Sequence, residues 1–285
     1  MRERTRLLLL LGPAVALVGG LVLGALGLAL LRSLRLLPLE EPGLSAYASV
    51  LASPGVLASL ALSFWIATVS TLIAAGLALA AAMLLRQAFP GRRLVAVLVQ
   101  LNLTIPHVVG AIGILYLISQ SGSFARLAHA AGLIAAPGEF PALTHDPWAI
   151  GIILTYVWKE VPFITLILLA KLQTLGPDLG PVARSLGATR WQAFRFVLLP
   201  QLLPALAAGA ALVFAFAFGA YEVPLVLGAH APEALPLRAW RSFTDVDLAA
   251  RPEAFAISIL IAALGAGLLA LHARLILPRR GRDAG

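Results

Sequence analysis

Six apolar runs, each about as long as a bilayer crossing, dominate this chain of 285 residues. A helix needs about 20 apolar residues to cross a hydrocarbon core of about 30 Å. Only 12% of the residues are charged, about half the charged fraction of a typical soluble domain. The chain is therefore predicted to be an all-α polytopic membrane protein with six transmembrane helices, at 7–31, 57–85, 94–119, 148–172, 202–221 and 255–277.

The first run has a signal peptide as its alternative, and the third and fourth runs each contain a proline. The run at 7–31 follows a basic N-terminal segment, as in a signal peptide. It is longer than the roughly 7–15 apolar residues of a signal peptide, so an uncleaved helix is predicted. Pro106 and Pro162 lie inside the third and fourth runs, where a kink or a local unwinding is expected.

The distribution of Arg and Lys orients the six spans. If the N-terminus is cytoplasmic, the cytoplasmic segments hold 14 of these residues and the external segments hold 6. Cytoplasmic loops of membrane proteins carry this excess of positive charge. Both termini and the segment 173–200 are therefore predicted to be cytoplasmic. The net charge of +8 then reflects membrane orientation and does not indicate nucleic-acid binding.

The chain divides into three predicted parts. Residues 1–54 form a first helix and an external loop, residues 55–277 form the main transmembrane domain, and residues 278–285 form a cytoplasmic basic tail. There is no cysteine, which excludes disulfides and thiolate metal sites. No catalytic or metal site is predicted.

The cytoplasmic segment 181–200 contains the start and end signals of two short helices. Proline is favoured at the first helical position, so Gly180 and Pro181 predict a helix start, and Gly187 predicts its end in the left-handed conformation. Thr189 and Gln192 have the spacing of a capping box that starts the second helix. Helices this short are unstable alone, so the segment must pack on its own bundle or on a partner. An ordinary interfacial linker is the alternative.

This segment resembles the cytoplasmic signature loop of the permeases of binding-protein-dependent ABC importers, the MetI-like superfamily. The family pattern is Glu-Ala-Ala, three residues, Gly, nine residues, then Ile-x-Leu-Pro. Ala183 matches the second alanine, Gly187 the glycine, and Val197, Leu199 and Pro200 the end of the pattern. Pro181 replaces the usual glutamate and Val182 the first alanine. The residues implied to couple to an ATPase are Ala183, Arg184, Ser185, Leu186, Gly187, Ala188 and Pro200.

The resemblance implies a permease subunit of the bacterial inner membrane, with the coupling loop 173–200 between the fourth and fifth helices. Its implied partners are a dimer of ABC ATPase subunits, a second permease (identical or homologous), an external solute-binding protein and membrane lipid. The permease would not be an enzyme and would hold no cofactor, since ATP and Mg would bind to the ATPase. The chain itself has no Gly-Lys-Ser/Thr phosphate loop.

Polar residues inside the predicted spans are candidates for the substrate pathway, because ionisable groups are costly at that depth. Lys159 and Glu160 lie near the middle of the fourth span, and Asn102 and His107 flank Pro106 in the third. Neighbouring residues on a helix point in different directions, so one of Lys159 and Glu160 could face the pathway while the other pairs with a helix. Purely structural charges and an interhelical hydrogen bond are the alternatives.

Tyr221 and Glu222 are the last two pathway candidates, at the end of the fifth span. The stretch 218–224 resembles permeases of the spermidine/putrescine branch, whose relatives include permeases for ferric iron, thiamine and phosphonates. An acidic group near the pathway would suit a cation such as a polyamine, although a Tyr–Glu pair can also be an interfacial anchor. Two other classes of protein stay open: a secondary transporter, which would need charge relays or repeat symmetry, and a membrane assembly subunit that transports nothing.

Overall fold

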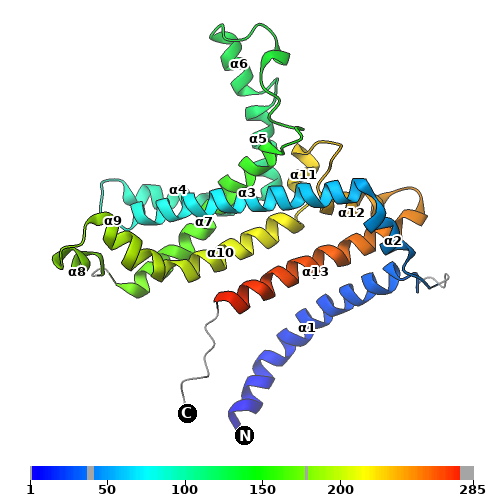
Figure 1. Cartoon of the computed structure of the whole chain (residues 1–285), viewed down its shortest axis with the longest axis horizontal. Helices are drawn as coiled ribbons and strands as arrows, with labels where there is room; N and C mark the ends of the chain where they lie inside the picture. Colours follow the sequence, from blue (N-terminus) through cyan, green and yellow to red (C-terminus); the bar gives the residue numbers. More distant parts are fainter. Residues whose placement is uncertain (1, 37–41, 177–178, 277–285) are drawn as a thin grey trace.

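A computed structural model describes residues 2–36, 42–176 and 179–276, and in these residues it shows an elongated helical bundle without strands (Figure 1). The longest helices lie side by side in the bundle, and short helices close its two ends. The helical elements are α1 (Arg2–Ser33), α2 (Ser45–Ala52), α3 (Pro54–Leu85), α4 (Arg92–Thr104), α5 (His107–Ile118), α6 (Ser123–Ala130), η1 (Pro137–Glu139), α7 (Ile150–Leu175), α8 (Leu179–Ser185), α9 (Arg190–Gln192), η2 (Ala193–Leu198), α10 (Leu199–Gly219), α11 (Glu222–Leu227), α12 (Leu235–Thr244), η3 (Leu248–Ala250) and α13 (Arg251–Ile276).

Six helical stretches of the described chain are long and apolar enough to cross a membrane. The all-α prediction with six transmembrane helices is therefore confirmed. The predicted tail 278–285 lies outside the described residues. The six stretches are Leu9–Ser33, Pro54–Leu85, His107–Ala130, Ile150–Leu175, Arg190–Gly219 and Leu248–Arg274.

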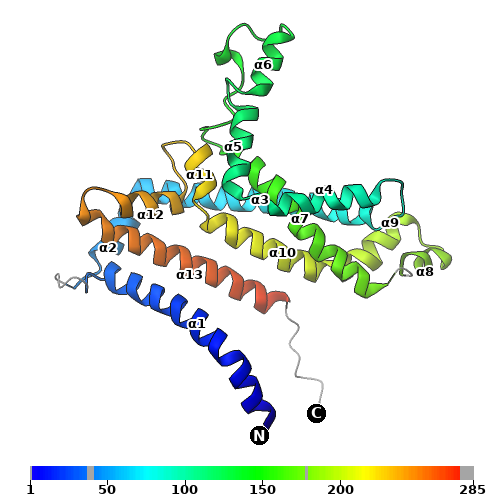
Figure 2. The ribbon, with the colours of Figure 1, turned by 180° about the vertical axis from the view of Figure 1, so that it is seen from behind.

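The third predicted span is not one helix. α4 ends at Thr104, Ile105 is extended (φ −79°, ψ 124°), and α5 begins after Pro106. A proline ring disfavours helical backbone at the residue before it, which ends α4 at this point. α5 leaves the bundle and projects with α6 as an arm (Figures 1 and 2). The predicted interruption at Pro106 is confirmed, whereas the continuous span 94–119 is wrong.

The fourth predicted span, in contrast to the third, is one continuous helix. α7 runs without interruption from Ile150 to Leu175, although Pro162 lies inside it. The predicted unwinding at Pro162 is therefore wrong. A proline leaves one carbonyl of the preceding turn without its main-chain donor, and in a membrane a side chain of a neighbouring helix can replace that donor.

The fifth span begins earlier and ends earlier than predicted. α9, η2 and α10 form one continuous stretch, Arg190–Gly219, in which η2 is a π-helical turn. Pro200 is the second residue of α10, just after η2. Its ring and missing N–H disturb the regular hydrogen-bond ladder, and the wider turn accommodates them. The stretch ends at Gly219 because Ala220 is extended (φ −81°, ψ 139°).

The core is built on close contact between α3, α7 and α10. Ala74, Ala78 and Ala82 of α3 are fully buried and pack with Ile164 and Leu168 of α7. Small residues let two helix backbones approach closely, which is how helices associate in lipid without a hydrophobic driving force.

α1 lies at the edge of the bundle. It packs along α13, and its N-terminal part diverges from the other helices (Figures 1 and 2). Large apolar side chains on every side of α1, including Leu9, Val15, Leu21 and Leu23, are exposed. A helix that is apolar all round needs lipid or a second subunit around it.

The contact between α5 and α7 gives a test of this packing. A Cβ atom on Gly110 would lie 2.9 Å from Cζ3 of Trp158, whereas a Cβ atom on Gly113, one turn further along α5, would meet nothing within 4 Å. Alanine is favoured over glycine inside a helix by about 0.5–1 kcal/mol. We expect Gly113→Ala to raise the melting temperature of the purified chain slightly and Gly110→Ala to lower it, because overpacking costs about 1–3 kcal/mol. Equal effects of the two variants would contradict the packing described here.

Candidate functional site

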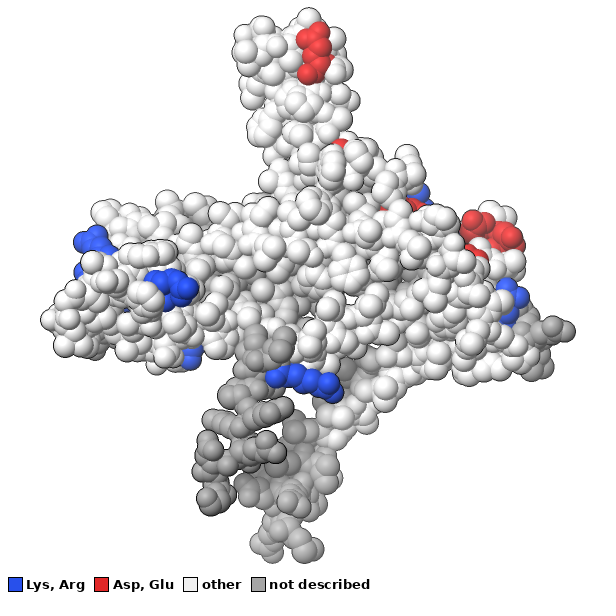
Figure 3. All heavy atoms as spheres, in the orientation of Figure 1, with Lys and Arg blue, Asp and Glu red and all other residues white. Residues whose placement is uncertain are grey.

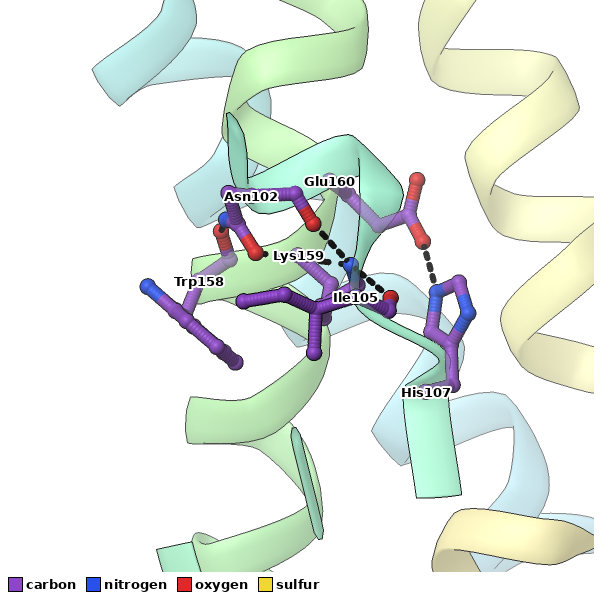
Figure 4. A network of polar contacts seen from close by, with 6 residues as sticks. All are labelled: Asn102, Ile105, His107, Trp158, Lys159 and Glu160. Carbon is purple, nitrogen blue, oxygen red and sulfur yellow. Dashed lines mark hydrogen bonds and ion pairs between the residues drawn. The ribbon is translucent and has the colours of Figure 1, made fainter. Parts of the chain in front are cut away.

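Lys159 joins α7 to the break between α4 and α5 (Figure 4). The side chain is buried, and its ammonium donates hydrogen bonds to the main-chain oxygens of Asn102 and Ile105, the second over 2.6 Å. Asn102 lies in the last turn of α4 and Ile105 directly follows the helix; the Asn102 oxygen also accepts from the N–H of Ile105 over 3.2 Å. Carbonyls at a helix end lack the regular donors of the helix interior. Positive charge is also favoured at a helix C-terminus. Lys159 therefore holds the end of α4 against α7.

Asn102 makes the return contact. Its Nδ2 donates to the main-chain oxygen of Trp158 (Figure 4). In a regular helix the Trp158 oxygen would accept from the N–H four residues later, which is missing in Pro162. By the same count the Asn102 oxygen lacks its regular donor at Pro106 and accepts instead from the N–H of Ile105. Each proline thus removes the regular donor of one carbonyl, and a side chain from the other helix donates to that carbonyl.

Glu160, the next residue of α7, reaches the start of α5 at the same break (Figure 4). His107, the first residue of α5, donates from Nε2 to Oε1 of Glu160 over 2.9 Å. Glu160 is buried and His107 is partly exposed, with side-chain exposures of 9% and 28%. The ring of His107 also lies 4.7 Å from that of Phe216 in α10. This pair therefore links α5, α7 and α10.

The prediction that Tyr221 and Glu222 end the fifth span is wrong, because these residues lie at the start of the short helix α11. Oε2 of Glu222 accepts from the main-chain N–H of Tyr221, the residue before α11, over 3.2 Å. The Tyr221 ring stacks on Trp240 of α12 at 5.9 Å. It lines a cavity of about 320 Å³ with Trp240, Phe243 and Phe255.

The predicted coupling segment has the local structure expected from its helix start and end signals. Gly187 has φ +91°. The N–H groups of Gly187 and Ala188 donate to the oxygens of Arg184 and Ala183, over 3.0 and 3.1 Å. This pair of bonds is the Schellman motif that ends many helices. α8 begins at Leu179, two residues before the predicted start.

The second helix of this segment begins as predicted. The Thr189 hydroxyl accepts from the N–H of Gln192, and the Gln192 side chain accepts from the N–H of Thr189. This confirms the capping box. Val182, Leu186 and Trp191 stand exposed around it, with 83% of Leu186 accessible. A rigid double turn with exposed apolar side chains suits a docking surface, since exposed apolar clusters mark interaction sites.

Sequence reasoning missed three participants in the site. Trp158 and Ile105 contribute main-chain oxygens, and Phe216 contributes a ring between His107 and Tyr156. The Trp158 oxygen could have been found, because it lies four residues before a proline in a membrane span. The Ile105 oxygen and Phe216 depend on how helices distant in sequence pack together, and no local pattern marks them.

A family model described as "Binding-protein-dependent transport system inner membrane component" matches residues 72–282. This match covers α4 to α13 and the whole segment with the Schellman turn and the capping box. The chain belongs to this family. It is the permease subunit of an ABC importer, and a separate ATPase hydrolyses the ATP. It is a multi-pass membrane protein, and in bacteria the family is found in the inner membrane.

Two named relatives match this permease over most of its length. The sulfate transport system permease protein CysT of Escherichia coli (strain K12) is 28% identical over 261 residues, which are 91% of this chain and 90% of CysT. A probable molybdenum ABC transporter permease protein, HVO_B0370, of Haloferax volcanii is 30% identical over 209 residues, 73% of this chain and 71% of the relative.

The fold of the permease is that of a solved importer. A crystal structure of a bacterial ABC transporter involved in the import of the acidic polysaccharide alginate contains a chain with a TM-score of 0.79 to this one. The match covers 98% of this chain and 99% of that chain at 18% sequence identity. These comparisons support the predicted family but carry no specific link to the spermidine/putrescine branch.

Proposed function

We propose that this permease serves an importer for a small inorganic oxyanion of the sulfate type. The observation that carries the proposal is the similarity to the sulfate permease CysT along 91% of the chain and 90% of that relative. The second relative is named for molybdenum, which cells take up as an oxyanion of the same tetrahedral shape. Polyamines, ferric iron, thiamine and phosphonates are the alternatives that the sequence left open.

The engagement of the two candidate carboxylates supports an anionic solute over a polyamine. Glu160 accepts from His107, and Glu222 accepts from the N–H of Tyr221. A polycation would need unengaged carboxylates along its route, because desolvating a cation is costly without opposite charge. His107, Glu160, Tyr221 and Glu222 stay the proposed pathway residues, whereas we assign Asn102 and Lys159 to holding the helices.

The segment 183–188 is the proposed docking site for the ATPase, with Pro200 near the start of α10. The exposed apolar side chains and the rigid turn at Gly187 support this assignment. The same end of the bundle carries an excess of positive charge, so we place it and both chain termini in the cytoplasm. An ATPase dimer with bound ATP and Mg, a second permease and an external binding protein would complete the importer.

Solute uptake by the reconstituted importer tests the proposed substrate. The permease would be placed in vesicles with its ATPase and partner permease, and the binding protein added outside with labelled sulfate, molybdate or spermidine. We expect uptake of sulfate or molybdate that requires internal ATP, and no uptake of spermidine. Vesicles without ATP are the control. ATP-dependent accumulation of spermidine, without uptake of either oxyanion, would return the assignment to the polyamine branch.

A further inference from the structure

A basic cavity lies where α8 and α9 meet the end of α3. Its volume is about 370 Å³. Arg86 follows the last residue of α3, Arg184 lies on α8, and Arg190 begins α9. Their side chains line the cavity together with Met83, Gln87, Gly180, Pro181, Ala193, Phe194 and Leu198. The end of α3 thus contributes one guanidinium group, and the distant segment of α8 and α9 contributes two.

The charge around this cavity is uniformly positive in the described chain. None of its lining residues is acidic, and the described residues of 79–104 and 179–204 contain no Asp or Glu. We call this part of the molecule the basic end; its cations are Arg86, Arg92, Arg93, Lys171, Arg184, Arg190 and Arg195. Figure 3 shows blue without red at that end, while red gathers on the projecting arm and at the opposite end.

The cavity also has an apolar wall at the height where a membrane span ends. Met83 lies in the last turn of α3, and Phe194 and Leu198 lie in η2. Leu84, beside Met83, is 52% exposed on the outside of the helix. The side chains thus change from apolar to basic within one helical turn, as they do where hydrocarbon meets lipid headgroups.

Arg86 connects this cavity to a second one. The second cavity has a volume of about 360 Å³ and is lined by Arg86 and Arg92 with four uncharged residues of α7 and its end, Leu169, Leu172, Gln173 and Gly176. The Arg86 guanidinium also lies against α8, since a Cβ on Gly180 would be 3.8 Å from its Nη1. A ligand bound to Arg86, Arg184 and Arg190 would therefore tie α8 and α9 to the end of α3.

We propose that the first cavity binds the phosphate headgroup of an anionic phospholipid such as phosphatidylglycerol. Arginine forks bind phosphate oxygens in pairs, and basic pockets between transmembrane helices bind anionic headgroups. A free oxyanion offers the same charge but no acyl chain to cover Met83 and Phe194, which are partly exposed. The bound lipid would brace the proposed coupling helix from the membrane side. This goes beyond the proposed function and does not depend on the solute.

Lipid binding to the full-length permease tests the proposal. Native mass spectrometry of the detergent-purified chain would be titrated with phosphatidylglycerol and, separately, with phosphatidylcholine. We expect Arg86→Gln/Arg190→Gln to bind phosphatidylglycerol about tenfold or more weakly than the unaltered chain, given about 1 kcal/mol per basic residue. Arg190→Gln alone, which leaves α3 unaltered, should show a smaller loss. Arg184 is left unchanged because it belongs to the proposed coupling segment.

The control variant is Arg93→Gln/Arg195→Gln, which removes the same charge from exposed positions at the basic end that line neither cavity. It should bind phosphatidylglycerol within about twofold of the unaltered chain. Equal losses in both double variants, or equal binding of phosphatidylcholine, would overturn the proposal. Displacement of the lipid by millimolar inorganic phosphate would assign the cavity to a free oxyanion instead. Release of the lipid on adding the ATPase would assign it to that subunit. None of these measurements involves uptake, so failure of the proposed substrate leaves them unaffected.

Discussion

Gly187→Val is expected to separate ATP hydrolysis from uptake. Gly187 ends α8 with φ +91°, a conformation that costs a β-branched residue about 1–3 kcal/mol. The open space around it means that the backbone, and not a clash, decides the outcome. Relief of this strain would undo the turn and displace Leu186, weakening ATPase binding by a factor of about 5 to 150. Uptake in vesicles and co-purification of the ATPase would both fall, while the amount of folded permease stays the same.

Two further variants separate docking from strain. Gly91 also has positive φ (+84°) and open space around it, and it lies at the same end of the bundle, before α4. Gly91→Val should therefore carry similar backbone strain and leave ATPase binding intact. Gly187→Asn should retain most of the uptake, because asparagine tolerates the left-handed conformation. Normal uptake in Gly187→Val, or an equal loss in Gly91→Val, would count against residues 183–188 as the docking site.

Lys159→Met is expected to destabilise the bundle more than other single changes of charge. It leaves the oxygens of Asn102 and Ile105 without the ammonium group in a buried position. Each hydrogen bond from a charged donor contributes about 1.5–3 kcal/mol, and interhelical bonds in membranes contribute somewhat less. A loss of about 2–4 kcal/mol should lower the melting temperature in detergent on the order of 5–10 °C.

The matched control is Lys171→Met on the same helix. Lys171 is partly exposed near the end of α7, and its removal should change the melting temperature little. A sharper test adds Pro106→Ala, which restores the N–H that could bond to the Asn102 oxygen. The double variant Lys159→Met/Pro106→Ala should lose less stability than the sum of the two single variants. Strict additivity, or equal melting temperatures for the two lysine variants, would contradict the assigned role of Lys159.

The elements that follow from local rules could be predicted from the sequence. The capping box of Thr189 and Gln192 and the turn at Gly187 involve residues within a few positions of one another, and both form as expected. The apolar runs also predicted the spans, because their length is set by the bilayer and not by neighbouring helices. Residues 57–85 differ from α3 by only three positions at one end.

The two prolines show why other elements could not be predicted. Pro106 and Pro162 lie in similar apolar runs, yet α4 and α5 separate at the first while α7 continues through the second. At both prolines a side chain of the other helix donates to the affected carbonyl, so the donors do not distinguish them. They differ in the residue before the proline, since Ile105 is extended whereas Val161 lies within the continuous α7. The sequence marked Lys159 and Asn102 as unusual because they are polar in a membrane span. It could not show that Asn102 donates to the Trp158 oxygen and Lys159 to the Asn102 and Ile105 oxygens.

The exchange of donors between α4 and α7 also constrains how this chain can change over evolutionary time. The polar side chains of Asn102 and Lys159 destabilise a membrane span unless they donate hydrogen bonds to carbonyls. Pro106 and Pro162 destabilise their helices unless another group donates to the carbonyls that lack their regular donors. Substitution of one of these four residues therefore leaves a polar group on the other helix without its hydrogen-bond partner. The four positions therefore form one inherited unit, in which substitutions on two distant helices are expected to occur together across descendants.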